Sequence, residues 1–183
     1  LSTGNVDHLF HSETFEGLTY VPRDDTGFAN FMKGEKRSGK IADRFTVDEA
    51  IRWIASLPES EPYFIYLNLQ NSPLPYETPA DFPRRFGPHS IDFTIRFNDF
   101  PRARIETVKD IYADSLAYTD HQLGRLIEYL KDSGQWGRTL LVVTGDTGQA
   151  FYEHGFAAHA NMVFDEVMRV PLLMRVPGGE GVS

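Results

Sequence analysis

A long helical segment followed closely by an uninterrupted apolar strand is the feature that most restricts the fold of this chain. Between about residues 103 and 133, side chains of one helix face recur every three or four positions: Ile105, Val108, Tyr112, Leu116, Thr119, Leu123, Leu126, Ile127 and Leu130. Ser133 and Gly134 end this predicted helix. The stretch "TLLVVTGD", 139–146, then predicts a continuous apolar strand, the kind that lies inside a parallel sheet covered on both faces.

Other segments complete an alternating pattern of helices and strands. "TVDEAIRWIASL", 46–57, predicts a helix that Thr46 caps and Glu49 supports as a capping box. "PYFIYLNLQ", 62–70, predicts a buried strand, and the five-proline stretch 71–88 predicts a long loop after it. A last strand is expected near 170–175, whereas 1–45 predicts largely irregular structure. We therefore expect one α/β domain over 1–183, a sandwich with a largely parallel sheet.

Composition narrows the classes of partner and chemistry. The chain has 183 residues, no cysteine and a formal net charge of −8. The acidic balance, without a basic stripe, argues against nucleic acid as a partner. The absence of cysteine excludes disulfides, zinc–thiolate sites and a cysteine nucleophile within these residues. No run approaches the roughly 18 apolar residues that a membrane span needs.

Candidate chemistry gathers after the strand 139–146. In open α/β sheets, ligands bind beyond the carboxyl ends of the strands, which is where Asp146 is expected. His154 and His159 follow within 14 positions of it. The same residues have plainer interpretations, because an aspartate that follows a strand and precedes a glycine is common in turns and as a helix cap. His154 fits a polar turn, and "HAN" at 159–161 fits a helix start.

Several separate segments, in order, resemble the sulfatase family of the alkaline phosphatase superfamily. They are "YADSLAYTDHQLGRLIEYLKDSGQWGRTLLVVTGDTGQ" (112–149), "HGFAAHANMVFDEVMRVPLLMRVPG" (154–178) and "PYFIYLNLQNSPLPYETP" (62–79). The similarity covers roughly residues 46–178. It implies an alkaline-phosphatase-like three-layer sandwich, incomplete because its N-terminal part is absent. It also implies cleavage or transfer of sulfate or phosphate esters at a divalent metal ion (Ca, Mg, Mn or Zn).

The resemblance assigns roles to four residues. Asp146 matches the family's metal-binding aspartate, and Thr147 occupies the neighbouring metal-ligand position. His159 matches a downstream Lys or His position that touches the ester or its leaving group, which implies a catalytic role. His154 lies in a family-like "EHG" turn, which implies a supporting, substrate-binding role.

Three departures from the family pattern weaken the implied site. The family usually has His or Asn where this chain has Thr147, and commonly has a histidine where this chain has Pro73. A proline offers neither a side-chain proton nor a backbone donor. The family's nucleophile and first metal-binding acids have no counterpart here. Ser2, Thr3 and Asn5 resemble sequence downstream of that nucleophile and have no basic partner nearby in the chain.

Three hypotheses follow from the sequence. The chain is the C-terminal portion of a sulfatase-like metal-dependent hydrolase or transferase, inactive by itself and completed by a longer parent chain. Alternatively, it is a degenerate, non-catalytic relative that binds or regulates. The third hypothesis is an unrelated α/β binding module, which an antiparallel sheet, or Asp146 at the wrong end of its strand, would favour.

The resemblance and the incomplete fold lead to further expectations about partners. A half-sandwich leaves sheet edge and apolar surface uncovered, so self-association or packing against a missing N-terminal segment is expected. "LNLQNS", 67–72, is similar to membrane-anchored relatives, so the resemblance allows a membrane-anchored parent chain. It also allows a periplasmic or extracytoplasmic domain, while the residues themselves leave the compartment open.

Overall fold

The computed structural model describes residues 2–3, 42–159 and 162–178. Most of the stretch 1–45, expected to be irregular, lies outside the described residues, as do two of the three residues of "HAN". Within the described ranges, no helix is long and apolar enough to cross a bilayer.

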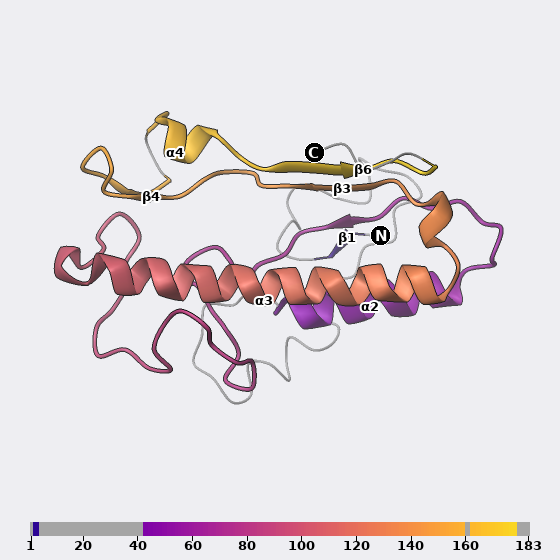
Figure 1. The fold of residues 1–183 in the computed structure, drawn as a ribbon, viewed down its shortest axis with the longest axis horizontal. Helices are drawn as coiled ribbons and strands as arrows, with labels where there is room; N and C mark the ends of the chain where they lie inside the picture. Colours follow the sequence, from indigo (N-terminus) through magenta and orange to yellow (C-terminus); the bar gives the residue numbers. More distant parts are fainter. Residues whose placement is uncertain (1, 4–41, 160–161, 179–183) are drawn as a thin grey trace, which may run out of the picture.

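Two long helices lie side by side and form one layer (Figure 1). α2 spans Asp43–Ser56 and α3 spans Ile105–Asp132, preceded by a 3-10 turn, η1, at Arg102–Arg104. A buried apolar cluster joins the two helices through Val47, Ile54, Leu126 and Leu130. The helix predicted from about 103 to 133 is therefore confirmed, because its spacing of apolar positions is sustained over many turns.

The capping box predicted at the start of α2 is wrong. The helix begins three residues earlier, and Thr46 is buried inside it. A side chain from elsewhere supplies the cap, because the Asp43 N–H donates to Asn71 Oδ1 at 2.8 Å. The Asp43 carboxylate accepts the Asn71 N–H at 3.1 Å and the Thr119 hydroxyl at 2.6 Å. Tertiary contacts with the loop after residue 67 thus decided where α2 starts.

The C-terminal end of α3 follows the sequence expectation. Ser133 N–H donates to the Tyr129 carbonyl, and Gln135 N–H donates to the Leu130 carbonyl. Gly134 has a φ of 69°, a conformation that glycine adopts without steric cost. A 3-10 turn, η2, at Trp136–Arg138 then leads into the next strand.

The described strands form three separate pairs. β1 (Ser2–Thr3) and β2 (Tyr66–Leu67) run parallel, whereas β3 (Leu141–Thr144) pairs antiparallel with β6 (Leu172–Arg175). β4 (Ala150–Phe151) and β5 (Ala157–Ala158) form a short antiparallel hairpin, and α4 spans Asp165–Met168. The expectation of a largely parallel sheet is wrong for two of the three described pairs, because the chain reverses direction between β3 and β6 and between β4 and β5. The strand predicted over 62–70 shrinks to two residues.

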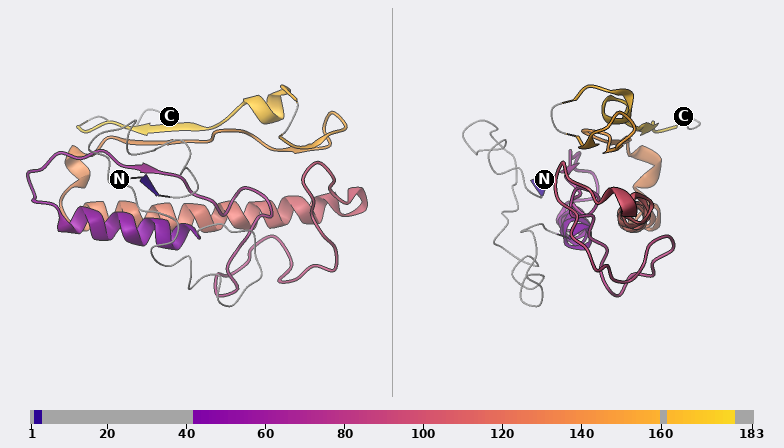
Figure 2. Two further views of the ribbon diagram at one scale, coloured as in Figure 1. Left: turned by 180° about the vertical axis from the view of Figure 1, so that it is seen from behind. Right: turned by 90° about the vertical axis from the view of Figure 1, so that its left-hand side faces the viewer.

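The strand pairs lie on one side of the helical layer. Figure 2, seen from the end, shows β3 and β6 on the side of β2 that faces away from α2 and α3. The prediction that the strand at 139–146 is covered on both faces is wrong for the described residues, since Val142 is 47% exposed and its partner Met174 is 43% exposed. Leu172, 62% exposed, continues this face. An apolar strip of sheet therefore meets solvent.

Buried polar groups fix the loop 71–88 against α3. The Asp114 side chain is fully buried, and its oxygens accept three backbone N–H groups: Arg85 at 2.8 Å, Phe86 at 3.2 Å and Gly87 at 2.8 Å. A second apolar cluster lies near the first turns of α3 and includes Tyr76, Phe100 and Val108. α3 thus holds the loop 71–88, which has little regular structure of its own, through a buried carboxylate and through apolar contacts.

Candidate functional site

Asp146 lies where the sequence placed it, just beyond the carboxyl end of β3. Gly145 separates it from Thr144, the last residue of the strand, and the Asp146 side chain is exposed. Its Oδ1 accepts the backbone N–H of Thr147 at 2.9 Å. This contact matches the plainer turn-cap interpretation. It leaves Oδ2 without a hydrogen bond from the described residues, so the carboxylate can still bind a ligand.

The turn that carries Asp146 is held against α4. Gly148 N–H donates to the Val167 carbonyl at 2.7 Å, and Gln149 N–H donates to the Glu166 carbonyl at 2.9 Å. A Cβ atom at Gly148 would lie 2.1 Å from the Glu166 carbonyl oxygen, far inside van der Waals contact. Glycine is therefore required at this position by close backbone approach.

His154 pairs with a carboxylate that the sequence pattern did not indicate. Its Nδ1 lies 2.8 Å from Glu166 Oε1, and its ring stacks on Phe164 with centroids 4.2 Å apart. The hydrogen bond from His154 is the main reason that the pKa of Glu166 is lowered from its ordinary value. The backbone around His154 forms a tight turn in which Gly155 N–H donates to the Tyr152 carbonyl. The expected polar turn is therefore present, with its imidazole oriented by Glu166.

His159 has an uncharged partner. Its Nδ1 lies 3.3 Å from Gln149 Oε1, and the Phe97 ring meets the imidazole edge to face at 5.2 Å. Sequence reasoning missed Gln149 and Phe97, because neither is close to His159 along the chain. The only available signal for Gln149 was its position three residues after Asp146.

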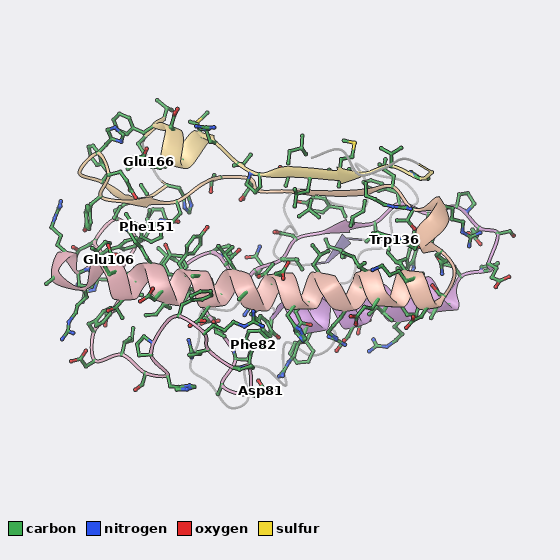
Figure 3. The ribbon with its side chains drawn as sticks, in the orientation of Figure 1. Asp81, Phe82, Glu106, Trp136, Phe151 and Glu166 are labelled. Atoms are coloured by element: carbon green, nitrogen blue, oxygen red, sulfur yellow. The ribbon has the colours of Figure 1, made fainter. Side chains whose placement is uncertain are left out.

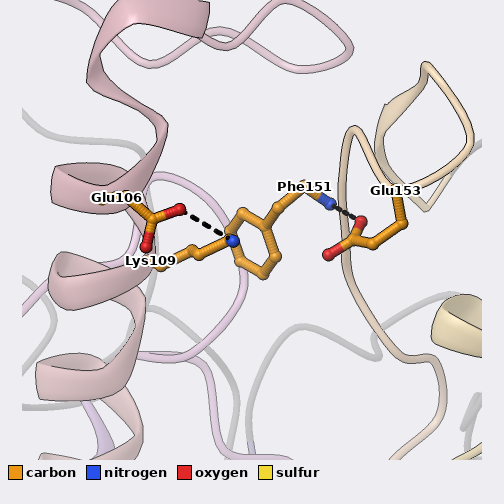
Figure 4. A network of polar contacts seen from close by, with 4 residues as sticks. All are labelled: Glu106, Lys109, Phe151 and Glu153. Atoms are coloured by element: carbon orange, nitrogen blue, oxygen red, sulfur yellow. Dashed lines mark hydrogen bonds and ion pairs between the residues drawn. The ribbon is translucent and has the colours of Figure 1, made fainter.

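The hairpin β4–β5 faces the start of α3. Figure 3 shows Phe151 and Glu166 at the end of the molecule where Glu106 lies in the first turn of α3, with Trp136 at the opposite end. Figure 4 shows two local hydrogen bonds, one between Lys109 and Glu106 and one between Phe151 and Glu153. Lys109 Nζ donates to Glu106 at 3.0 Å, and the Phe151 N–H donates to Glu153 at 2.5 Å. The hydrogen bond that Lys109 donates to Glu106 is the main reason that the pKa of Lys109 is raised. Both hydrogen bonds are local to their own element, so the apolar packing of Phe151 beside the first turns of α3 is what joins the hairpin to the helix.

The predicted site residues are not assembled into one metal centre. Among the residues that the structure describes, no hydrogen bond or ion pair joins Asp146 to His154 or His159. In the same ranges, no three His, Cys, Asp or Glu side chains are grouped so that they could hold a metal ion. Thr147 is exposed and contributes its backbone N–H to Asp146. The described residues therefore provide one carboxylate suited to a divalent cation but no complete ligand set.

Pro73, where the family pattern has a histidine, takes part in a turn. Its carbonyl accepts the Tyr76 N–H at 3.0 Å, and the Leu74–Pro75 peptide bond is cis. Asn71 braces the same loop, with its Nδ2 donating to the Glu77 carbonyl at 2.7 Å. The loop is thus well anchored to its neighbours, but Pro73 adds no side-chain proton to it.

Comparison with known proteins shows which family the chain as a whole resembles. The family model described as Sulfatase matches residues 2–182. The chain is 24% identical to iduronate 2-sulfatase of Mus musculus over 174 residues, covering 76% of this chain and 31% of that protein. It is 28% identical to arylsulfatase K of Danio rerio over 173 residues, covering 75% of this chain and 33% of that protein. The chain thus spans about a third of the length of these relatives.

Solved structures give the same picture of the fold. The crystal structure of the phosphonate monoester hydrolase of Agrobacterium radiobacter superposes with a TM-score of 0.59 at 22% identity. That match covers 75% of this chain and 34% of the hydrolase. The likeness supports an α/β fold of the alkaline phosphatase type for the part that is shared.

Proposed function

The chain belongs to the sulfatase family of the alkaline phosphatase superfamily, and we propose that it forms part of a metal-dependent hydrolase or transferase acting on sulfate or phosphate esters. The family is generally metal-dependent. The observation that carries the proposal for this chain is the exposed Asp146 carboxylate, with Oδ2 free of partners among the described residues, at the carboxyl end of β3. In open α/β sheets, ligands bind beyond the carboxyl ends of the strands.

Each candidate residue then has a role that its surroundings permit. Asp146 supplies one oxygen ligand, and the remaining ligands and the nucleophile come from elsewhere in a longer protein. A divalent ion bound there would polarise the ester and lower the pKa of the nucleophile. His159, steadied by Gln149 and Phe97, exchanges a proton or hydrogen bond with the ester or its leaving group. His154 holds the neighbouring turn through Glu166 and supports substrate binding.

We expect the chain by itself to be inactive, because one carboxylate does not make a metal site. The competing function is a degenerate domain that binds or regulates without turnover. Two observations favour it: Thr147 replaces a usual ligand, and Pro73 replaces a histidine and is built into a turn. An antiparallel sheet would favour the third hypothesis, an unrelated module, and β3 and β6 do pair antiparallel. The family match over residues 2–182 nevertheless overturns it.

Metal content and turnover separate catalysis from the degenerate alternative. The test uses the longest native protein that contains these residues, purified with Mg²⁺, Ca²⁺, Mn²⁺ or Zn²⁺ and assayed on 4-nitrophenyl sulfate and on 4-nitrophenyl phosphate esters. Catalysis requires a stoichiometric ion that is lost in Asp146→Asn and retained in Asp120→Asn, an exposed carboxylate on α3. A protein that retains no ion and turns over neither ester would leave only the binding or regulatory function.

The exposed apolar strip on β3 and β6 suggests that another layer of the fold covers this face in a longer protein. We propose that in a longer protein this pair joins a larger sheet covered on both faces, the three-layer sandwich of the family. In isolation, the chain should self-associate through Val142, Leu172 and Met174. Light scattering should show oligomers that Leu172→Lys disperses and that Leu116→Lys, an exposed control on α3, leaves unchanged. A clean monomer at high concentration would refute self-association.

A further inference from the structure

We infer that Gln149 is a positioning residue that fixes the tautomer of His159, keeping the proton on Nδ1 and leaving Nε2 as the atom that meets the substrate. The part concerning substrate rests on the proposed function, whereas the tautomer itself does not. The observation is the contact between His159 Nδ1 and Gln149 Oε1 at 3.3 Å. Gln149 directly precedes β4 and His159 directly follows β5, so both lie at the open end of this hairpin.

The orientation of the Gln149 amide is set by a second contact. Its Nε2 donates to the Ala150 carbonyl at 3.4 Å, which turns Oε1 toward the imidazole. An amide oxygen only accepts hydrogen bonds, so the facing ring nitrogen must donate. In neutral imidazole the other nitrogen then carries the lone pair. The opposite tautomer would set two acceptors against each other.

The rest of the surroundings keeps this geometry in place. Gln149 N–H donates to the Glu166 carbonyl at 2.9 Å, so the backbone that carries the amide is attached to α4. Gly148, at which no Cβ fits, makes the neighbouring contact to Val167. The edge-to-face contact of Phe97 limits rotation of the imidazole plane. The amide and the ring are therefore both held while they face each other.

Comparison with the other histidine of the site shows what the amide contributes. Glu166 likewise contacts Nδ1 of His154, but its carboxylate adds an ion pair whenever the imidazole is protonated. Gln149 orients His159 without bringing a charge. Any proton that His159 takes from or gives to an ester or leaving group then moves at Nε2, where no described side chain competes for it.

The size of the effect follows from the distances. Both contacts of the Gln149 amide are longer than the usual 2.9–3.0 Å for N–H···O, so each is a weak hydrogen bond. Removing a bond that contributes about 1 kcal/mol changes an equilibrium by about fivefold. We expect Gln149→Met, which keeps the length of the side chain but removes its strong acceptor, to lower the ratio of Nδ1–H to Nε2–H His159 by about that factor.

Long-range ¹H–¹⁵N correlation spectra of the imidazoles provide the test on this chain. The chain has six histidines, so the His159 signals are assigned by their loss in His159→Asn. The expected result is an Nδ1–H tautomer in the wild type, the fivefold decrease in Gln149→Met, and retention in Gln149→Glu, which keeps an oxygen acceptor. His154 serves as an internal control, because Glu166 still holds it.

Two outcomes would overturn the inference. If His159 of the wild type carries its proton on Nε2, the inference is refuted. This outcome needs no variant, so it can be observed even if Gln149→Met does not fold. An unchanged tautomer ratio in a folded Gln149→Met also refutes it. Because the spectra need no turnover, an inactive longer protein with the expected spectra would sink only the proposed catalysis. In an active one, Gln149→Met should lower kcat while changing KM little.

Discussion

Replacing Asp114 is the sharpest test of how the loop 71–88 is held. The carboxylate is fully buried, and three backbone N–H groups donate to it. In Asp114→Asn, the amide oxygen can keep the two bonds from Arg85 and Phe86. The new NH₂ group would then face the Gly87 N–H, which is also a donor. One charge-assisted bond is lost and the other two become neutral ones.

The cost can be worked out from these contacts. A hydrogen bond to a charged group contributes about 1.5–3 kcal/mol and a neutral one about 1 kcal/mol. Losing the first and weakening the others should lower the free energy of unfolding by about 3 kcal/mol, after relief from burying a charge is subtracted. The control, Asp110→Asn, changes an exposed side chain of the same helix and should shift stability by less than about 0.5 kcal/mol.

Urea unfolding followed by circular dichroism measures this difference, and hydrogen exchange locates it. If the loss is local, the Gly87 amide should exchange about a hundredfold faster, since each 1.4 kcal/mol corresponds to about tenfold. The Arg85 amide should change less, because it keeps its acceptor. The carboxylate does not hold the loop as described if Asp114→Asn and the Asp110→Asn control lose the same free energy of unfolding. The same conclusion follows if the Gly87 amide stays equally protected from exchange.

Three further predictions concern single side chains. The buried hydroxyl of Tyr76 makes no hydrogen bond with the described residues, so Tyr76→Phe should raise the free energy of unfolding by about 1 kcal/mol; a loss in urea unfolding would reveal a hidden partner. Because the hydrogen bond from His154 lowers the pKa of Glu166, the pair stabilises the fold above the ordinary glutamate value of 4.5. The stability difference from Glu166→Gln should shrink as the pH falls through the lowered pKa, and a difference that widens on acidification contradicts this sign. In a longer protein with the upstream acids, Thr147→His should tighten divalent metal binding by at least about tenfold in calorimetric titration; unchanged affinity would mean that the second ligand comes from elsewhere.

The elements predicted well are those governed by local periodicity. The start and end of α3 were close to the prediction, and Asp146 lies beyond β3 as expected. The start of α2 was misplaced, because Asn71, a residue 28 positions away, caps the helix instead of Thr46. The strand at 62–70 was overestimated, since among the described residues only Tyr66 and Leu67 of this stretch pair with another strand, β1.

The candidate site also contains residues that the sequence predicted and partners that it did not. Residue type and family resemblance pointed to Asp146, Thr147, His154 and His159, and their roles stay predictions. The partner Glu166 had no recognisable pattern, and Gln149 had only its position near Asp146, because each meets its histidine only after the chain folds back. Asp114 was also missed, since a lone acidic residue in a helix is usually solvated.

By itself, the sequence determined the long helix, its glycine stop, the strand that follows and the family to which the chain is related, because periodicity and residue order are local properties. Only the tertiary structure decided that β3 pairs antiparallel with β6, that an apolar strip of sheet is exposed, and which oxygen faces each imidazole. These outcomes depend on which distant segments the chain brings into contact. Hydrogen bonds and burial choose among such arrangements only once the backbone has folded back on itself.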